Sequence, residues 1–191
     1  MAGPAGFEPA NAGTKTQCLT TWRRSITWII LPYISKIVKR TQIDYNIYMI
    51  KIIAGGKKHP NWLIEATSEY DKRLHKPWNM EWVFMEEEKL NSYLETWPFT
   101  GNDYVIIADE RGQNVSSPEF ATKLDQAFLH SKNIIIIIGG AYGFSETIRN
   151  KANFLWSFSR LVFPHQIARL IVAEQIYRAN QILNNTSYHH E

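Results

Sequence analysis

Three stretches of the chain combine glycine or polar residues with an apolar run just before them. They are residues 109–112 (DERG), 139–143 (GGAYG) and 159–164 (SRLVFP). Glycine has no Cβ, so a turn at Gly139-Gly140 can bring bare backbone N–H and C=O groups close to a ligand. A glycine-rich turn also serves as an ordinary connection between a strand and a helix. The glycines alone leave both interpretations open.

Familiar catalytic motifs do not account for these stretches. The chain has no G-x-x-x-x-G-K-[ST] phosphate loop, and residues 139–143 do not follow G-x-G-x-x-G. No serine sits in a G-x-S-x-G turn, and no His/Glu pair has the spacing of metal ligands. The single cysteine, Cys18, excludes a disulfide framework and a cysteine metal site, and it fits a reducing, cytoplasmic location. The residues by themselves therefore predict a nucleotide-like pocket of undefined occupant, without a metal.

Alternating strands and helices position the three stretches. Five consecutive isoleucines, residues 134–138, cannot face water on either side and predict a central strand buried on both faces. Further strands are expected at 50–54, 80–85, 104–108 and 154–158, and helices at 60–75, 86–97, 118–130, 145–153 and 165–183. This order predicts an α/β fold with a mostly parallel sheet flanked by helices. Because the carboxyl ends of parallel strands meet at one edge, the three stretches should line a single crevice.

Two helix starts carry local signals. Ser116 with Glu119 three residues later fits a capping box before the helix at 118–130. Pro164 precedes the last helix, and His165 follows it. His165 either caps that helix or belongs to the site, and the sequence leaves both open.

Residues 1–48 differ in composition from the rest of the chain. They hold six of the 21 Lys and Arg residues and two of the 18 acidic ones, which leaves fifteen and sixteen for residues 49–191. Nucleic-acid binding by residues 49–191 must therefore use a local patch, not a global field. The apolar run at 26–38 is shorter than the roughly 20 residues that span a bilayer, and no signal-peptide cleavage site follows it.

The extension has two interpretations, a membrane-surface helix or sequence without a role. Residues 3–24 resemble conceptual translations that run through a transfer-RNA gene, and Met49 opens a clean strand. We therefore expect residues 1–48 to be a poorly ordered extension or a misassigned start, and residues 49–191 to be the functional domain. N-terminal mass spectrometry of the native protein tests this, and peptides from residues 1–48 would contradict it.

Several motifs in order resemble one family. They are Ile138-Gly139-Gly140-Ala141-Tyr142-Gly143-Phe144, Leu155-Trp156-Ser157-Phe158-Ser159, Phe163-Pro164-His165-Gln166-Ile167-Ala168-Arg169, Glu174-Gln175-Ile176-Tyr177-Arg178-Ala179 and Tyr188-His189. Together they resemble the ribosomal RNA large subunit methyltransferase H family, within the SPOUT class of knotted methyltransferases. The resemblance covers residues 49–191, and residues 1–48 have no counterpart in it.

The resemblance implies a fold, an activity and partners. The implied fold is an α/β domain whose C-terminal part forms a trefoil knot, an exception to the rule that chains avoid knots. The implied enzyme is a cytoplasmic homodimer without a metal or a membrane partner. It uses S-adenosylmethionine to methylate N3 of a pseudouridine in the helix 69 stem-loop of 23S ribosomal RNA, on assembled ribosomes.

The same resemblance, carried over residue by residue, implies the site. The cofactor contacts are Ala108, Gly140, Ser159, Arg160, Leu161, Val162, Phe163 and Pro164. The catalytic group is His189, Arg178 and Tyr188. N3 of the uracil ring must lose its proton, and histidine titrates near neutral pH, so His189 is the expected base with help from Arg178. The proton could also leave to water.

The chain departs from the family at its end, and two other functions remain open. Residues 184–187 (NNTS) replace a turn that usually contains Gly or Pro, and residues 190–191 replace a usual terminal basic residue. One alternative is a non-catalytic, knotted, ribosome-binding relative, which the retained Gly139-Gly140, Tyr188 and His189 disfavour. The other is a doubly wound nucleotide enzyme such as a dehydrogenase, which the missing G-x-G-x-x-G disfavours.

Overall fold

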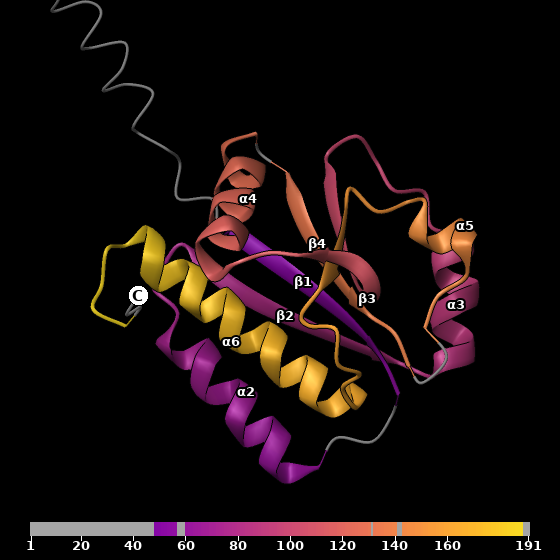
Figure 1. Ribbon diagram of the computed structural model, residues 1–191, viewed down its shortest axis with the longest axis horizontal. Coiled ribbons are helices and arrows are strands. Elements are labelled where there is room, and N and C mark those ends of the chain that lie inside the picture. Colours follow the sequence, from indigo (N-terminus) through magenta and orange to yellow (C-terminus); the bar gives the residue numbers. More distant parts are fainter. Residues whose placement is uncertain (1–47, 57–59, 131, 141–142, 189–191) are drawn as a thin grey trace, which may run out of the picture. The chain divides into compact units, whose positions relative to one another are not determined.

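The computed structural model describes residues 48–56, 60–130, 132–140 and 143–188 of the 191-residue chain. Its elements are β1 (Tyr48–Gly55), α2 (Asn61–Arg73), β2 (Trp78–Met85), α3 (Glu87–Thr96), β3 (Asp103–Asn114), α4 (Ser117–Leu129), β4 (Asn133–Ile138), α5 (Glu146–Arg149), β5 (Phe154–Ser157) and α6 (His165–Leu183) (Figure 1). Strands and helices alternate, which confirms the α/β fold expected from the sequence. The expected extension lies outside the described residues, apart from Tyr48.

The five strands form one sheet in the order β2-β1-β4-β3-β5. Every neighbouring pair of strands is parallel. The isoleucine strand β4 lies in the middle, with Ile134 paired to Ile50 of β1 on one side and to Tyr104 of β3 on the other. The prediction of a central strand at residues 134–138 is confirmed.

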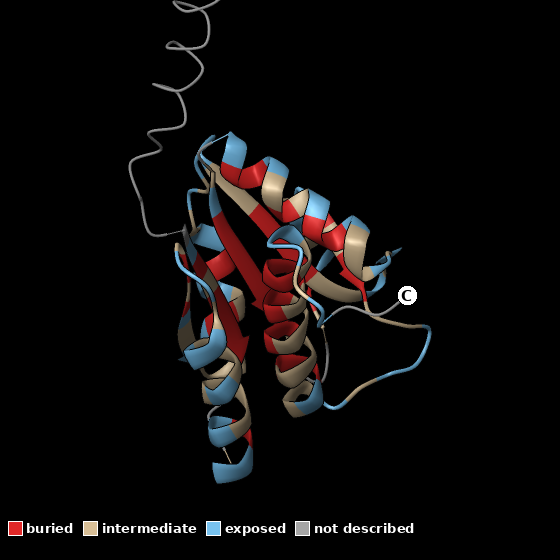
Figure 2. Ribbon diagram, turned by 90° about the vertical axis from the view of Figure 1, so that its left-hand side faces the viewer, coloured by how far each residue is buried: buried red, intermediate tan, exposed pale blue. Residues whose placement is uncertain are grey.

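Each face of the sheet has its own apolar layer, because successive side chains of a strand point to opposite faces. The even-numbered isoleucines of β4 pack with buried side chains of α4 and α6, and partly buried side chains of α2 join this layer. The odd-numbered isoleucines pack with α3 and α5. Helices α2, α4 and α6 thus cover one face, and α3 and α5 cover the other (Figure 1). Figure 2 shows the buried strands between the helices, and several buried residues on α4 and α6.

Two predicted helices have the expected ends. The Ser116 hydroxyl accepts a hydrogen bond from the Glu119 backbone N–H at 3.4 Å, and the Glu119 carboxylate accepts one from the Ser116 N–H at 2.7 Å. The capping box before α4 is therefore confirmed. Helix α6 spans residues 165–183, as its apolar pattern predicted.

The helix expected at residues 145–153 is much shorter than predicted. Ser145 caps it as expected, but α5 ends at Arg149. The reason lies at Asn153, whose side-chain oxygen accepts a hydrogen bond from the Val105 N–H at 2.7 Å. The Asn153 N–H in turn donates to the Val105 carbonyl at 2.9 Å. These two bonds hold Asn153 against β3, so the chain leaves the helix early to enter β5.

Strand β3 is longer than predicted and wraps closely against β5. Trp156 of β5 pairs with Ala108 and also with Gln113, because residues 109–112 form an irregularity between them. A Cβ at Gly112 would lie only 2.6 Å from the carbonyl carbon and oxygen of Leu155. The backbone of β3 therefore passes directly against the peptide between Leu155 and Trp156.

Candidate cofactor and active site

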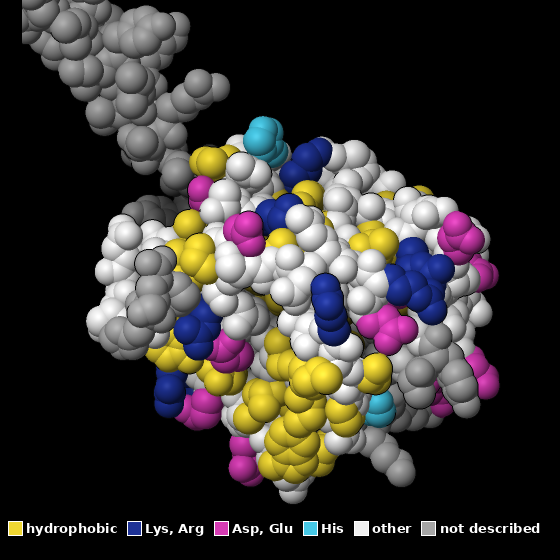
Figure 3. All heavy atoms as spheres, in the orientation of Figure 1, with side chains coloured by type: hydrophobic (Ala, Val, Ile, Leu, Met, Phe, Trp, Pro, Cys, Tyr) yellow, Lys and Arg dark blue, Asp and Glu magenta, His cyan; other side chains and the backbone are white. Residues whose placement is uncertain are grey.

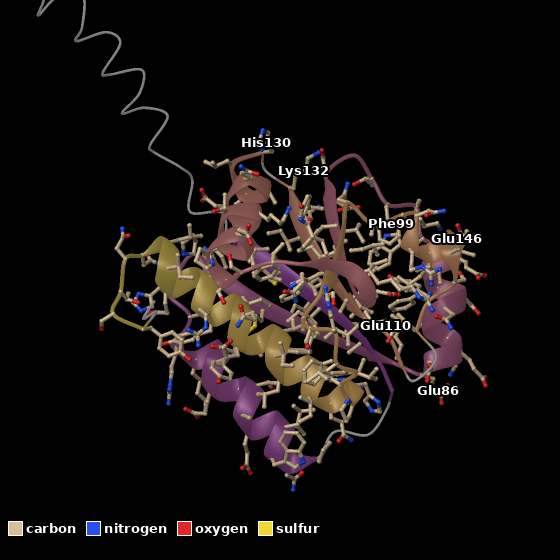
Figure 4. All side chains as sticks on the ribbon, in the orientation of Figure 1. Glu86, Phe99, Glu110, His130, Lys132 and Glu146 are labelled. Carbon is tan, nitrogen blue, oxygen red and sulfur yellow. The ribbon has the colours of Figure 1, made fainter. Side chains whose placement is uncertain are left out.

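A cavity of about 560 Å³ opens at the carboxyl ends of β3, β4 and β5, beside the start of α6. Its lining comes from all three stretches that the sequence singled out. The lining residues are Ala108, Asp109, Glu110, Arg111, Ile138, Gly139, Gly140, Gly143, Trp156, Ser157, Phe158, Ser159, Leu161, Val162, Phe163, Pro164, His165 and Ala168. Figure 4 shows Glu110 at this end of the sheet, while His130 and Lys132 lie at the opposite end. The expected single crevice is present.

Neighbouring side chains pack tightly against Gly139 and Gly140 in the turn after β4. A Cβ at Gly139 would lie 2.9 Å from the ring of Phe144, and one at Gly140 would lie 2.0 Å from the carboxyl carbon of Glu87. Gly143 has a φ of 66°, which favours glycine, and a Cβ there would meet nothing within 4 Å. Gly140 lines the cavity, but neighbouring protein already takes the space of its missing side chain.

The contact between Gly140 and Glu87 yields a stability prediction. Gly140→Ala forces the Glu87 carboxylate to move, and because this is the flexible end of a side chain it lowers the free energy of unfolding by only about 1 kcal/mol. Glu87→Ala in the same chain removes the clash, so the double variant is more stable than the sum of the two single changes predicts. Urea unfolding of the four proteins measures this coupling. Strict additivity of the two substitutions would contradict the packing described here.

The loop after β5 is shaped by two serine hydroxyls. Ser159 Oγ accepts a hydrogen bond from the Leu161 N–H at 3.0 Å, and Ser157 Oγ donates to the Ser159 carbonyl at 2.9 Å. These bonds fix the turn, so the loop lines the cavity in a defined conformation. The side chains of Leu161 and Val162 remain 69% and 81% exposed at the cavity. Arg160 is exposed and does not line the cavity, unlike the other seven residues expected to contact the cofactor.

The polar turn of β3 is also internally bonded. Asp109 Oδ1 accepts a hydrogen bond from the Arg111 N–H at 2.9 Å, which closes the turn next to Ala108. Ala108 pairs with Ile138 on one side and with Trp156 on the other, and all three line the cavity. The charged side chains of Asp109, Glu110 and Arg111 therefore line the cavity next to these apolar residues.

The start of α6 is fixed to the end of β1 through Arg169. This residue is only 1% exposed, and its guanidinium donates to the carbonyls of Gly55 and Gly56, at 3.3 Å for the latter. It also lies 5.4 Å from the ring of Phe84. Burial lowers the pKa of Arg169. The helix has no side-chain cap, and His165 lines the cavity, so of its two open interpretations the structure favours a place at the site.

Arg178 and Tyr188, two of the expected catalytic residues, meet at Glu174. Arg178 bonds Glu174 Oε1 through Nη2 at 2.6 Å and through Nε at 2.8 Å. The Tyr188 hydroxyl donates to the same oxygen at 3.4 Å, and the Arg178 guanidinium lies 4.9 Å from the Tyr188 ring. The bond to Glu174 raises the pKa of Arg178, and burial, with the charge of Glu174, raises the pKa of Tyr188. Both side chains therefore stay protonated at neutral pH.

Comparison with known proteins identifies the family. The family model described as "Predicted SPOUT methyltransferase" matches residues 48–189. The ribosomal RNA large subunit methyltransferase H of Methylobacillus flagellatus is 33% identical over 156 residues, covering 74% of this chain and 99% of that protein. The protein of the same name from Malacoplasma penetrans is 38% identical over 154 residues, covering 73% and 98%. The chain belongs to the ribosomal RNA large subunit methyltransferase H family.

The residues that carry the likeness to methyltransferase H fall into two separate groups within one chain. One group lines the cavity at the start of α6, around His165. The other lies thirteen residues further along α6, at Arg178, which corresponds to about 20 Å at 1.5 Å per residue. Neither Arg178 nor Tyr188 lines the cavity. His189, the third expected catalytic residue, lies outside the described residues.

Some lining residues were not among the cofactor contacts expected from the resemblance to methyltransferase H. Trp156 and Ser157 are the last residues of β5 and Phe158 follows them, and the rings of Trp156 and Phe158 meet edge-on at 4.6 Å. They were assigned to a strand and not to the site. The available signal was their position, because the last residues of a strand that precedes a lining loop stand at the same crevice. Within the described ranges, no group of three or more His, Cys, Asp or Glu side chains could hold a metal, and no helix could span a membrane.

Proposed function

We propose that this chain transfers a methyl group from S-adenosylmethionine to N3 of a pseudouridine in a stem-loop of 23S ribosomal RNA. It acts on assembled ribosomes, in the cytoplasm, as a homodimer. The observation that carries this proposal is the single cavity at the carboxyl edge of β3, β4 and β5. Its lining is built from the motif loops of a chain that matches the methyltransferase family over residues 48–189.

The cavity fits S-adenosylmethionine in size and chemistry. Its volume of about 560 Å³ falls within the range of about 300–1,000 Å³ usual for small-molecule sites. Apolar side chains and backbone N–H and C=O groups of residues 161–164 suit an adenine ring and its edge. The carboxylates of Asp109 and Glu110 suit the positive charges of the sulfonium and the amino group, and Arg111 suits the carboxylate. S-adenosylmethionine supplies an electrophilic methyl group when bound.

The residues of the chain must bind the target base and accept its N3 proton. Arg178 stays cationic and Tyr188 stays a hydrogen-bond donor, because the pKa of each is raised. They therefore suit binding of phosphate or of the uracil carbonyl oxygens, and stabilisation of the negative charge that develops on the ring. His189 follows Tyr188 directly, and an imidazole is suited to accept the proton near neutral pH.

A homodimer accounts for the separation of the two residue groups. Within one chain, the length of α6 separates Arg178 and Tyr188 from the cavity. If the tail of one chain lies at the cavity of a second copy, these two residues reach the cofactor bound by that second copy. Leu161 and Val162 are exposed apolar side chains at the cavity, which a second copy would cover. In Figure 3, hydrophobic side chains gather over the ends of α2 and α6 nearest the cavity. Such apolar areas are typical of obligate dimer interfaces.

The proposed function is tested with labelled S-adenosylmethionine and ribosomes that lack the modification. We expect one methyl group per large subunit on the pseudouridine, and none on ribosomes that already carry it. Mass spectrometry of the nucleosides identifies the methylated atom. Cofactor binding without methyl transfer would instead support the non-catalytic, ribosome-binding relative.

Substitution of His189 tests its role as the base. His189→Ala should lower turnover by about 100-fold or more, because general-base catalysis contributes that much. The affinity for S-adenosylmethionine, measured by titration calorimetry, should stay within about twofold, since the residue acts on the RNA. Equal losses in turnover and in cofactor affinity would refute the assignment.

A further inference from the structure

We propose that Thr186, through Gln181 and Asn180, is a positioning residue that holds the C-terminal tail so that Tyr188 lies over Arg178. The catalytic part of this inference rests on the proposed function. The positioning itself rests on a network of hydrogen bonds between the end of α6 and the tail. None of the three residues belongs to the cavity or to the expected catalytic group.

The network begins with two buried amides in the last turns of α6. Asn180 is 0% exposed and Gln181 is 4% exposed, although both side chains are polar. Asn180 Oδ1 accepts a hydrogen bond from the His75 N–H at 3.1 Å, and its Nδ2 donates to the His75 carbonyl at 3.2 Å. Both bonds reach the connection between α2 and β2. Asn180 therefore anchors the end of α6 to the body of the domain.

Gln181 extends this anchor to the tail. Its Nε2 donates to Asn180 Oδ1 at 3.4 Å, and its Oε1 accepts a hydrogen bond from the Thr186 hydroxyl at 2.8 Å. The backbone N–H of Thr186 also donates to the Gln181 carbonyl at 3.0 Å. Thr186 is thus held by its backbone and by its side chain.

The turn between them contains neither glycine nor proline. Asn185 has a φ of 53°, a conformation that asparagine tolerates better than most residues. Asn184 Nδ2 donates to the Asn180 carbonyl at 2.7 Å. Side-chain hydrogen bonds thus fix a turn that the sequence alone leaves flexible.

Thr186 is close enough to Tyr188 in the chain to restrict the position of the Tyr188 ring. Two residues of chain span at most about 7 Å, so fixing Thr186 restricts where the Tyr188 ring can lie. That ring meets Tyr177 edge-on at 4.8 Å and Arg178 at 4.9 Å. The last residues of a domain fray unless they are tied down, and this network ties the segment to α6.

The burial of the two amides favours a positioning role over simple packing. A buried amide costs free energy unless its hydrogen bonds are made, whereas an apolar side chain of similar size would pack without that requirement. Here the amides bond backbone and hydroxyl groups outside the helix. Unlike apolar side chains, the two amides fix the positions of the His75 backbone and of Thr186 relative to α6.

Three substitutions in the full-length protein test the inference. Thr186→Val keeps the shape but removes the hydroxyl, Thr186→Ser keeps the hydroxyl, and Ser187→Ala removes a neighbouring exposed hydroxyl for which the described residues provide no partner. Thr186→Val should lower kcat for methyl transfer to ribosomes about tenfold, the equivalent of one hydrogen bond. It should leave cofactor affinity unchanged and speed amide hydrogen exchange in the tail. Thr186→Ser and Ser187→Ala should both match the wild type.

The readouts separate this inference from the proposed function. If Thr186→Val has the wild-type rate of amide hydrogen exchange in the tail and the wild-type kcat, the inference is overturned. So would a loss of cofactor affinity as large as the loss of kcat, or a failure of Thr186→Ser to restore activity. If the wild-type protein transfers no methyl group, the proposed function fails. Tail exchange in Thr186→Val then still decides whether the network holds the tail.

Discussion

Gly112→Ala should lower the free energy of unfolding by at least about 3 kcal/mol, because overpacking against a backbone cannot be relieved by side-chain rotation. The new Cβ would lie 2.6 Å from the carbonyl group of Leu155 and 2.7 Å from the Trp156 nitrogen. Both neighbours are backbone atoms of β5, which is paired to β3 on either side of the irregularity. Relief requires the two strands to separate, and that would also open the cavity.

A matched control isolates the steric cause. Gly101→Ala introduces the same methyl group where no atom lies within 4 Å, and neither glycine has a positive φ. It should change the free energy of unfolding by less than about 0.5 kcal/mol. Urea denaturation of the two variants and the wild type measures the difference. Equal stabilities for the two variants would show that β3 and β5 do not pass each other as closely as described.

The sequence predicted the sheet because its signals are local. Five adjacent isoleucines can only be satisfied between two apolar layers, so β4 was found without any long-range information. The same holds for the Ser116–Glu119 capping box. In contrast, α5 ends early because Asn153 bonds to Val105, 48 residues away. The pairing of Trp156 with both Ala108 and Gln113 is likewise a contact that no local pattern contains.

The cavity was predicted in outline, but its finer chemistry was not. Parallel strands bring their carboxyl ends together, so the three polar stretches could be placed at one crevice from the sequence. The contact between Glu87 and Gly140 depends on how α3 packs on the sheet, which periodicity does not define. The separation of Arg178 from the cavity could be predicted, because Arg178 lies thirteen residues after His165 on the helix expected at 165–183.

Two inactive variants should regain activity when mixed, if each site is built from two chains. Ala108→Phe fills the cavity at the end of β3 and should abolish cofactor binding. Arg178→Met leaves the cavity intact but removes the cation beside Tyr188, and should lower turnover about 100-fold. In a mixed dimer, the Arg178→Met chain offers an intact cavity and the Ala108→Phe chain offers an intact tail. One of its two sites is therefore complete.

The size of the recovery follows from symmetry. Random exchange of equal amounts places one of each chain in half of the dimers, and each of these carries one working site of two. The mixture should therefore reach about a quarter of the wild-type rate, against almost none for either variant alone. Two different affinity tags on the chains confirm that mixed dimers have formed. If tagged mixed dimers form and remain inactive, then Arg178 serves the cavity of its own chain. The tail would in that case have to cross about 20 Å to reach the cofactor, the span from Arg178 back to His165 along α6.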